Sequence, residues 1–150
     1  VLDGALHDAL LFVDGVSSIG SIPFRMDDWG VDLAVTGSQK GLMLPAGLGI
    51  LGVSQKALAA SKTATMRRSY FEFGDQLKHN AGGYFPYTPP TQLLHGLRKS
   101  LDRMSDEGLD NVVARHHRLA SGVRAAVAAW GLPSVPAAEK LYAQGCSPVA

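Results

Sequence analysis

Residues 9–53 read ALLFVDGVSSIGSIPFRMDDWGVDLAVTGSQKGLMLPAGLGILGV, and three apolar runs within this stretch decide the fold. The runs lie at residues 9–14, 31–38 and 47–53, and small or turn-forming residues separate them. A short, continuous apolar run between turn residues is typical of a strand buried in a parallel sheet. Strands of this kind, followed by loops and helices, predict an α/β fold with a mainly parallel sheet.

Between and after the apolar runs, the sequence predicts short helical pieces and one long connection. Residues 25–32 predict a single helical turn that Gly30 closes. Ser54 is the expected N-cap of a helix over residues 55–61. Residues 62–90 show no sustained period and are rich in aromatic side chains, so we expect a long ordered loop with a functional role.

Two longer helices are predicted in the second half of the chain. They span residues 91–105 and about 110–130, and Gly131 with Pro133 ends the second one. Each carries apolar residues at three- and four-residue steps, the pattern of a helix with one buried face. The stripes consist of Leu94, Leu97, Leu101 and Met104 in the first helix, and of Val112, Val113, His116, Leu119, Val123, Val127 and Trp130 in the second.

Composition excludes several classes of protein. The 150 residues carry a net charge of +1 from 14 basic and 13 acidic residues, without a basic patch suited to nucleic acid or to a membrane surface. No apolar run is long enough to span a membrane. Cys146 is the single cysteine, which excludes an intramolecular disulfide and favours a cytoplasmic protein. Because the chain begins at Val1 and stops at Ala150, we expect an internal piece of a longer protein.

Asp14 and Lys40 form the candidate functional pair. Each follows an apolar run, and ligands of open α/β sheets bind beyond the carboxyl ends of the strands. A lysine attacks carbonyl groups only as the neutral amine, and apolar surroundings disfavour the charged form. Leu42, Met43 and Leu44 offer such surroundings. Pyridoxal phosphate enzymes require a lysine and an acid that pairs with the pyridine nitrogen. Taken singly, however, Asp14 could be a turn residue and Lys40 a surface residue.

The sequence between residues 9 and 131 resembles the class V aminotransferase family of fold-type I pyridoxal phosphate enzymes, within it the serine–glyoxylate and alanine–glyoxylate branch. The blocks VDGVSS, GSQKG and GGYFPYTPPTQLLHGLRKSLD carry the resemblance. It implies that residues 1–105 are the C-terminal part of the cofactor-binding large domain. Residues 106–150 would then be a connecting helix and the start of the small C-terminal domain.

The resemblance also implies roles for five residues. Lys40 would form the Schiff base with pyridoxal 5'-phosphate and move the substrate proton, and Asp14 would pair with the pyridinium nitrogen. Val16 would pack against the cofactor ring, and Gln39 would hold the cofactor near its phosphate or phenolic edge. Thr88 would contact the phosphate in the site of the other subunit of a homodimer.

Some parts of the site stay open. An aromatic residue that contributes an oxygen is expected near Thr88, and it could be Tyr84 or Tyr87, since Phe85 stands where relatives have a tyrosine. The arginine for the substrate carboxylate and the first phosphate-binding segment are expected outside this chain, and Arg67 and Arg68 are not assigned to either role. Without these parts, the 150 residues alone would be inactive.

The implied reaction is transamination from L-serine, or L-alanine, to glyoxylate, giving glycine and hydroxypyruvate or pyruvate. The alternatives are another class V enzyme, such as a lyase like cysteine desulfurase, and a non-catalytic homologue. A desulfurase would use a mobile cysteine, and only Cys146 is available. Desulfurases typically have a histidine before the lysine, where this chain has Gln39.

Two further patterns are excluded as functional motifs. Residues 47–52 satisfy the glycine spacing of a dinucleotide fingerprint, and Glu72 follows at the expected distance. The intervening residues are apolar, however, so the segment is predicted to be the third strand itself. His116 and His117 point in different directions on one helix and lack nearby metal ligands, so no metal site is expected.

Overall fold

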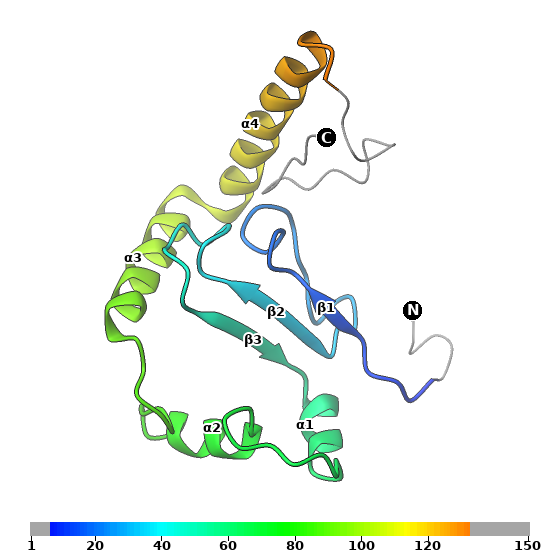
Figure 1. Cartoon of the computed structure of the whole chain (residues 1–150), viewed down its shortest axis with the longest axis vertical. Helices are drawn as coiled ribbons and strands as arrows, with labels where there is room; N and C mark the ends of the chain where they lie inside the picture. Colours follow the sequence, from blue (N-terminus) through cyan, green and yellow to red (C-terminus); the bar gives the residue numbers. More distant parts are fainter. Residues whose placement is uncertain (1–6, 133–150) are drawn as a thin grey trace.

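A computed structural model describes residues 7–132 (Figure 1). Within these residues, three strands and four helices follow one another in the order βββαααα. The elements are β1 (Phe12–Asp14), β2 (Leu33–Gly37), β3 (Gly49–Val53), α1 (Gln55–Ser61), α2 (Phe73–Asn80), α3 (Thr91–Glu107) and α4 (Leu109–Ala129). Cys146 and Pro133 lie outside the described residues, as does part of the expected second domain.

The strands form one sheet in the order β1-β2-β3. β1 and β2 are parallel, with Asp14 beside Val35, whereas β2 and β3 are antiparallel, with Gly37 beside Gly49. The α/β class is confirmed, but the described sheet is mixed where a mainly parallel one was predicted. The reason is the connection over residues 38–48, which turns the chain back without a crossover helix.

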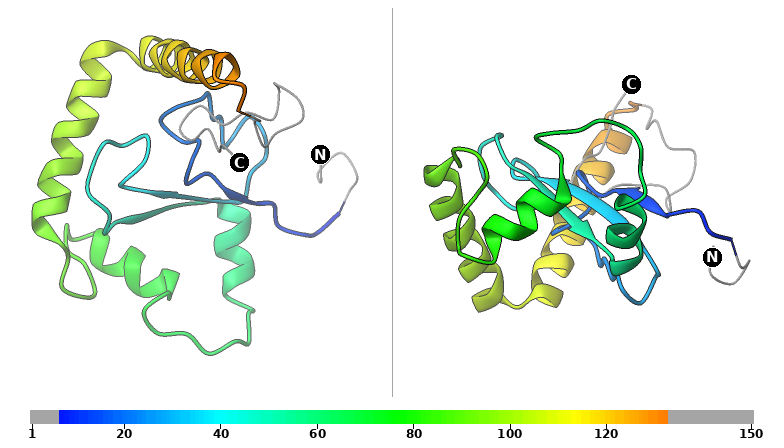
Figure 2. Two further views of the ribbon diagram at one scale, coloured as in Figure 1. Left: turned by 45° about the horizontal axis from the view of Figure 1, so that its top comes forward. Right: turned by 90° about the horizontal axis from the view of Figure 1, so that it is seen from below.

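Helices surround this small sheet. The left view of Figure 2 shows α1 and α2 on one side of the sheet and α4 on the other, while α3 stands beyond the end of the sheet at which β3 begins. β3 begins beside α3: a Cβ on Gly47 would lie 2.5 Å from the Leu93 side chain. The region 47–52 is a strand, as predicted, and therefore not a dinucleotide-binding turn.

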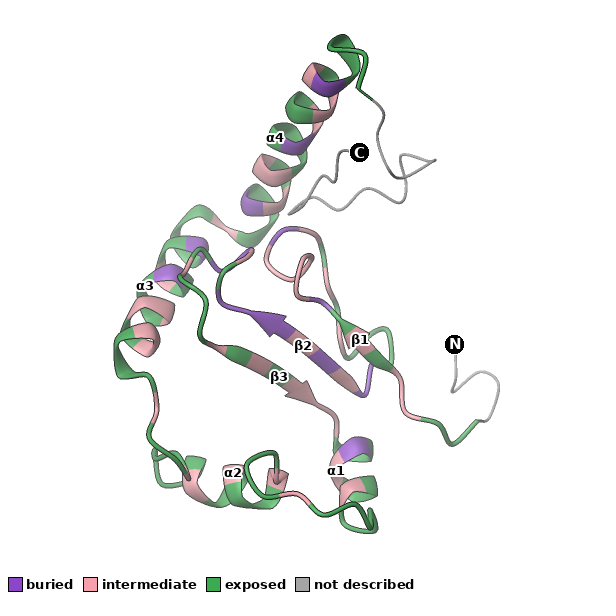
Figure 3. Ribbon diagram, viewed as in Figure 1, coloured by how far each residue is buried: buried purple, intermediate pink, exposed green. Residues whose placement is uncertain are grey.

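Burial is concentrated on β2 and on the turns around it (Figure 3). One apolar cluster joins Leu42, from the turn after β2, to Met104 of α3 and Val112 of α4, with Ile50 and Leu97 packed against it. The cluster fixes the end of the sheet that carries the turn after β2. It thereby gives the Lys40 segment a rigid support.

Residues 62–90 are not a continuous loop, because α2 occupies Phe73–Asn80. Glu72 is its N-cap and accepts a hydrogen bond from the Gly74 N–H at 3.2 Å. An acid in the first turn, Asp75, and bases in the last turn suit the helix dipole. Its only large apolar residues are Phe73 and Leu77, one helical turn apart, and a single pair is too short a pattern to distinguish a helix from a loop.

The predicted stripes of α3 and α4 are only partly buried. In α3, Met104 is buried as expected, but Leu101 is exposed and Ser100 takes its place in the interior. In α4 the buried positions are Val112, Ala120 and Val127. Leu119, Val123 and Trp130 were predicted on the buried face and are exposed. Spacing identified the helices correctly, but it did not identify which of two apolar faces packs on this part of the protein.

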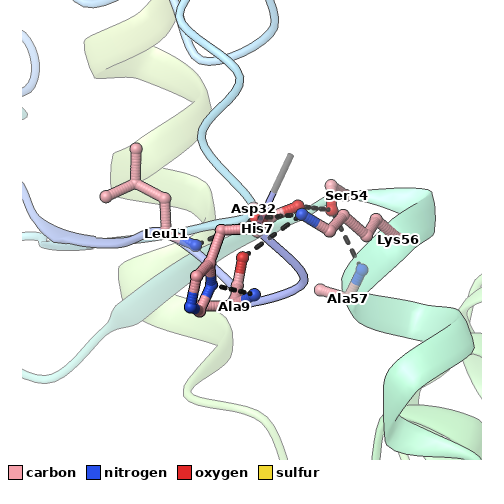
Figure 4. A network of polar contacts seen from close by, with 7 residues as sticks. All are labelled: His7, Ala9, Leu11, Asp32, Ser54, Lys56 and Ala57. Atoms are coloured by element: carbon pink, nitrogen blue, oxygen red, sulfur yellow. Dashed lines mark hydrogen bonds and ion pairs between the residues drawn. The ribbon is translucent and has the colours of Figure 1, made fainter. Parts of the chain in front are cut away.

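A polar network ties the sheet together at the end where β2 begins (Figure 4). Asp32 is buried, and its carboxylate accepts hydrogen bonds from the Leu11 N–H and the Ser54 hydroxyl, both at 2.9 Å. The Lys56 ammonium lies 3.7 Å from the same carboxylate. The Leu11 N–H, followed by the Ser54 hydroxyl and Lys56, holds the pKa of Asp32 below its ordinary value against the opposing effect of burial.

Candidate active site

Asp14 is the last residue of β1, and the parallel pairing with β2 determines its location. The Gly15 N–H continues the ladder by donating to the Val35 carbonyl at 2.9 Å. The Asp14 side chain is exposed, and its Oδ1 accepts the Val16 N–H at 3.0 Å. This local bond orients the carboxylate at the start of the turn and leaves it accessible to a ligand.

Lys40 lies three residues beyond the end of β2, on a turn with an extensive set of internal hydrogen bonds. Its side chain is half-buried, and its carbonyl accepts the Met43 N–H at 3.0 Å. Met43 adopts a φ of 58°, a left-handed conformation that non-glycine residues rarely take. The turn therefore holds the lysine in a defined and locally strained backbone.

The turns after β1 and β2 pack directly against each other through glycines. A Cβ on Gly41 would lie 2.5 Å from the Ile19 carbonyl oxygen. Gly20, with φ of 86°, faces it from the other turn, and a Cβ there would lie 3.1 Å from the Gly41 carbonyl carbon. The structure thus packs the turn that begins after Asp14 against the turn that carries Lys40, and both turns follow the carboxyl ends of neighbouring parallel strands.

The remaining predicted site residues have different surroundings. Val16 is half-buried in the turn after β1. Gln39 is exposed, and its side chain folds back over Gly37, so that a Cβ there would lie 2.7 Å from the Gln39 Oε1. Thr88 is exposed on the connection between α2 and α3, and none of the hydrogen bonds that hold the two turns involves it.

The aromatic residues near Thr88 are largely open to solvent in this chain. Tyr84 is the most exposed at 73%, and Phe85 and Tyr87 are both at 45%. Tyr87 packs against Tyr70 with ring centroids 4.9 Å apart. This contact joins the aromatic residues that follow α2 to those that precede it. An exposed aromatic surface of this kind is typical of a face that contacts another chain or another part of the same protein.

Ser38 and Ser21 are site components that the sequence reasoning did not single out. Ser38 is fully buried directly before Gln39, and its hydrogen bonds close the Lys40 turn. Ser21 lies beside Gly41, is almost fully buried, and its hydroxyl has no partner in the described structure. A signal for Ser38 was present, because a serine directly after the end of a strand commonly bonds the backbone of the turn that it begins.

Within residues 7–132, no three His, Cys, Asp or Glu side chains gather in a way that could hold a metal ion. None of the helices in this part of the chain combines the length and the apolar character that a membrane crossing requires.

Comparison with known proteins extends this description. The family Aminotransferase class-V matches residues 4–143. The serine–glyoxylate aminotransferase of Hyphomicrobium methylovorum is 61% identical over 150 residues, which cover 99% of this chain and 37% of that protein. The L-aspartate–glyoxylate aminotransferase of Paracoccus denitrificans is 57% identical over 148 residues, with the same coverage of both chains.

Solved structures agree with this result. The pyridoxamine–pyruvate aminotransferase of Mesorhizobium loti superimposes with a TM-score of 0.85 at 35% identity, over 97% of this chain and 38% of that one. The alanine–glyoxylate aminotransferase of a Nostoc species gives a TM-score of 0.84 at 27% identity, over 94% of this chain and 38% of that one.

A lysine and a carboxylate that follow the carboxyl ends of two parallel strands are the arrangement expected of an α/β enzyme that binds its ligand beyond those strand ends. Within that class the identity is specific: this chain belongs to the class V aminotransferase family. It spans little more than a third of the length of the relatives that it matches, 37% in the two cases above.

Proposed function

We propose that the protein containing this chain transfers the amino group of L-serine, or of L-alanine, to glyoxylate. The products would be glycine and hydroxypyruvate, or pyruvate. The 61% identity to a serine–glyoxylate aminotransferase supports the proposal, and relatives of the same name in Methylorubrum extorquens and Arabidopsis thaliana are 60% and 56% identical. Glyoxylate is also in the name of the relative from Paracoccus denitrificans, whose donor is aspartate.

The structural observation that carries the proposal is the contact between the turns of Asp14 and Lys40. Transamination through pyridoxal 5'-phosphate needs an amine and a carboxylate at one site, and Lys40 and Asp14 on the two adjoining turns would supply them. The donor set therefore fits this cofactor. When bound, pyridoxal phosphate supplies an electron sink for the negative charge that develops at the substrate Cα.

Each of the five proposed site residues would then have a separate task. The Lys40 amine would hold the cofactor covalently and carry the proton to and from the substrate Cα. The Asp14 carboxylate would keep a proton on the ring nitrogen. Val16 would pack on the ring, and Gln39 would hydrogen-bond near the phosphate or phenolic edge. Thr88 would contact the phosphate of the partner subunit's site.

This arrangement requires a homodimer with shared sites, which we propose as the working assembly. The exposed position of Thr88, among exposed aromatic residues, supports a role outside its own subunit. We further propose that the large domain ends at residue 105, close to the kink at Gly108 between α3 and α4, where φ is 84°. A cytoplasmic location is proposed on the low cysteine content.

A lyase like cysteine desulfurase is the second candidate. The cysteine desulfurase of Thermococcus onnurineus superimposes with a TM-score of 0.63 at 19% identity, which shows a common fold alone. Gln39 stands where such lyases typically have a histidine, and Cys146 lies outside the described residues. Transamination is therefore the preferred function over this lyase reaction, and over a non-catalytic homologue that would not need both Asp14 and Lys40.

The test is an assay of the full-length enzyme with pyridoxal phosphate and glyoxylate, in which serine, alanine, aspartate and cysteine are compared as donors. The proposal predicts glycine and hydroxypyruvate from serine, with cysteine giving no sulfide. If serine and alanine both yield no glycine while aspartate does, the donor assignment is wrong. With a dithiol added to reduce any enzyme persulfide, release of sulfide and alanine from cysteine at a comparable rate would support the lyase.

A further inference from the structure

Ser38 makes an unusual number of hydrogen bonds for a turn residue. Its side chain is completely buried. The hydroxyl donates to the Pro45 carbonyl at 2.7 Å and accepts the Leu48 N–H at 3.1 Å. Its backbone N–H donates to the Leu48 carbonyl at 3.1 Å, and its carbonyl accepts the Leu44 N–H at 3.0 Å. One residue therefore joins the beginning of the 38–48 turn to three positions near its end.

These bonds enclose the segment that carries Lys40. Gly37 precedes Ser38 and Gly41 follows Lys40, so glycine flanks this short segment on both sides. Glycine leaves the backbone free to adopt many conformations unless other contacts restrict it. The Ser38 hydroxyl supplies such a restriction from a position two residues before the lysine.

We propose that Ser38 is a positioning residue for Lys40: its hydroxyl closes the turn and fixes where the lysine backbone, and hence the amine, is presented beside the Asp14 turn. This inference rests on the proposed function, because it assigns the Lys40 amine a bond to pyridoxal phosphate. Small displacements of a reacting group cost much of the rate that good orientation provides. Loss of the hydroxyl should therefore weaken cofactor attachment out of proportion to its effect on folding.

Ser100 contributes to the same turn from outside. It is buried in α3, and its hydroxyl donates to the Leu42 carbonyl at 2.5 Å. This bond fixes the far side of the turn, two residues after Lys40. Ser100→Ala is therefore a second variant that loosens the turn without changing the residues next to the lysine.

Ser54 provides a matched control at the opposite end of the sheet. Like Ser38, it follows a strand and uses its hydroxyl both ways, accepting the Ala57 N–H at 3.0 Å and donating to Asp32 at 2.9 Å. Ser54→Ala should lower the free energy of unfolding, because it too removes one donated and one accepted hydrogen bond. It should leave the Lys40 turn unchanged.

The experiment uses the full-length protein, with wild type, Ser38→Ala, Ser100→Ala and Ser54→Ala. Three quantities are measured: hydrogen exchange of peptides covering residues 38–48, the dissociation constant for pyridoxal phosphate, and the pH midpoint of the visible absorption band. Each variant is measured at the same interval below its own unfolding temperature. For Ser38→Ala we expect faster exchange in this segment, about tenfold weaker cofactor binding and a shifted midpoint, since tenfold is the scale of one or two lost hydrogen bonds.

Ser54→Ala should change the unfolding temperature alone. The inference is overturned if Ser38→Ala accelerates exchange in residues 38–48 but leaves both cofactor quantities at the wild-type values, or if Ser54→Ala changes them equally. If Ser38→Ala does not fold, Ser100→Ala decides: weaker binding supports the inference and unchanged binding overturns it. A wild-type protein that forms no band with pyridoxal phosphate would reject the proposed function itself, before any serine variant is compared.

Discussion

Gly20 and Gly41 lie backbone against backbone, and this contact joins the turn that carries Asp14 to the turn that carries Lys40. At Gly41 a Cβ would lie 2.5 Å from the Ile19 carbonyl oxygen and 2.9 Å from the Gly20 carbonyl carbon. Real side chains do not tolerate such distances to backbone atoms, which cannot rotate away as a side chain can. The two halves of the candidate site therefore keep their separation because both positions are glycine.

Gly41→Ala should consequently separate the turns. We expect a loss of about 1–3 kcal/mol in the free energy of unfolding, the range for overpacking a filled site. Cofactor binding should weaken as well, because the Asp14 and Lys40 turns shift relative to each other. Denaturant unfolding and a pyridoxal phosphate titration measure the two effects.

Gly122→Ala is the control for that substitution. Gly122 is exposed within α4, and nothing lies within 4 Å of the position of its Cβ. Alanine should stabilise the helix there by up to about 1 kcal/mol. A Gly41→Ala protein with wild-type stability and wild-type cofactor affinity would show that the backbone contact is unimportant.

Met43 is strained, and the strain can be removed. Its φ of 58° suits asparagine or glycine better than methionine, and its side chain is 49% exposed. Met43→Asn should raise the free energy of unfolding by about 0.5–1 kcal/mol, because the left-handed backbone costs most residues about 1–2 kcal/mol and asparagine offsets part of that cost with a local side-chain hydrogen bond. Met66→Asn is the control, since Met66 is 82% exposed, and its unfolding curve should match that of the wild type. A destabilised Met43→Asn protein would show that the contacts of the methionine side chain stabilise the fold by more than its backbone conformation costs.

Asp32 should make stability depend on pH. Its pKa is held below the ordinary aspartate value of 3.8 by the Leu11 N–H first, then by Ser54 and Lys56. The folded state therefore favours the ionised carboxylate. The stabilisation that ionised Asp32 contributes is complete above the unfolded-state pKa. It is lost as the pH falls through the lower folded-state pKa. Asp32→Asn should cost about 1–3 kcal/mol at neutral pH and flatten the acid limb of the stability curve.

Thermal unfolding between neutral pH and the acid limit measures this effect. Asp28→Asn is the control, because Asp28 forms an exposed ion pair with Arg25 at 3.6 Å. Such surface pairs contribute little, so the control curve should follow the wild type. If the unfolding temperatures of wild type and Asp32→Asn fall equally steeply on the acid side, Asp32 is not responsible for the pH dependence of stability.

Most of the fold follows from local sequence signals. Ser54 marks the start of α1 because it accepts the N–H of Ala57, the role that an N-cap serine is expected to play. The direction of β3 could not be predicted, since a strand of apolar residues reads the same in a parallel or an antiparallel pair. The helix α2 was missed because it is short, with Phe73 and Leu77 as its one apolar pair, and because its N-cap is a glutamate rather than one of the usual cap residues.

The candidate site was only partly predictable. Asp14 and Lys40 could be placed at adjoining strand ends because parallel neighbours bring their carboxyl ends to one edge. The Gly20–Gly41 contact and the four hydrogen bonds of Ser38 depend on the paths of two turns, and local sequence does not specify those paths. The exposure of Leu119 and Val123 likewise depends on which surface packs against α4, which apolar spacing alone leaves open.

The proposed sharing of sites between subunits predicts complementation. Lys40→Ala lacks the amine of its own site, whereas Thr88→Ala lacks a phosphate contact of the partner's site. A mixed dimer would then contain one intact site. Unfolding and refolding the two full-length variants together should restore up to about a quarter of the wild-type sites, since random pairing makes about half of the two-fold dimers mixed. Activity no greater than the sum of the separately refolded variants would place Thr88 in the site of its own subunit, or outside any site.

The bond between Lys40 and the cofactor is the central claim, and reductive trapping tests it most directly. Full-length protein is incubated with pyridoxal phosphate, reduced with borohydride, digested with trypsin and analysed by mass spectrometry. The label should lie on Lys40, in a peptide covering residues 26–56 because trypsin no longer cleaves after the modified lysine. In Lys40→Arg, residue 40 should carry no label. No other lysine of that variant should reach the yield that Lys40 reaches in the wild type. A label of wild-type yield in Lys40→Arg, or one found mainly on Lys56 or another lysine of the wild type, would contradict the assignment.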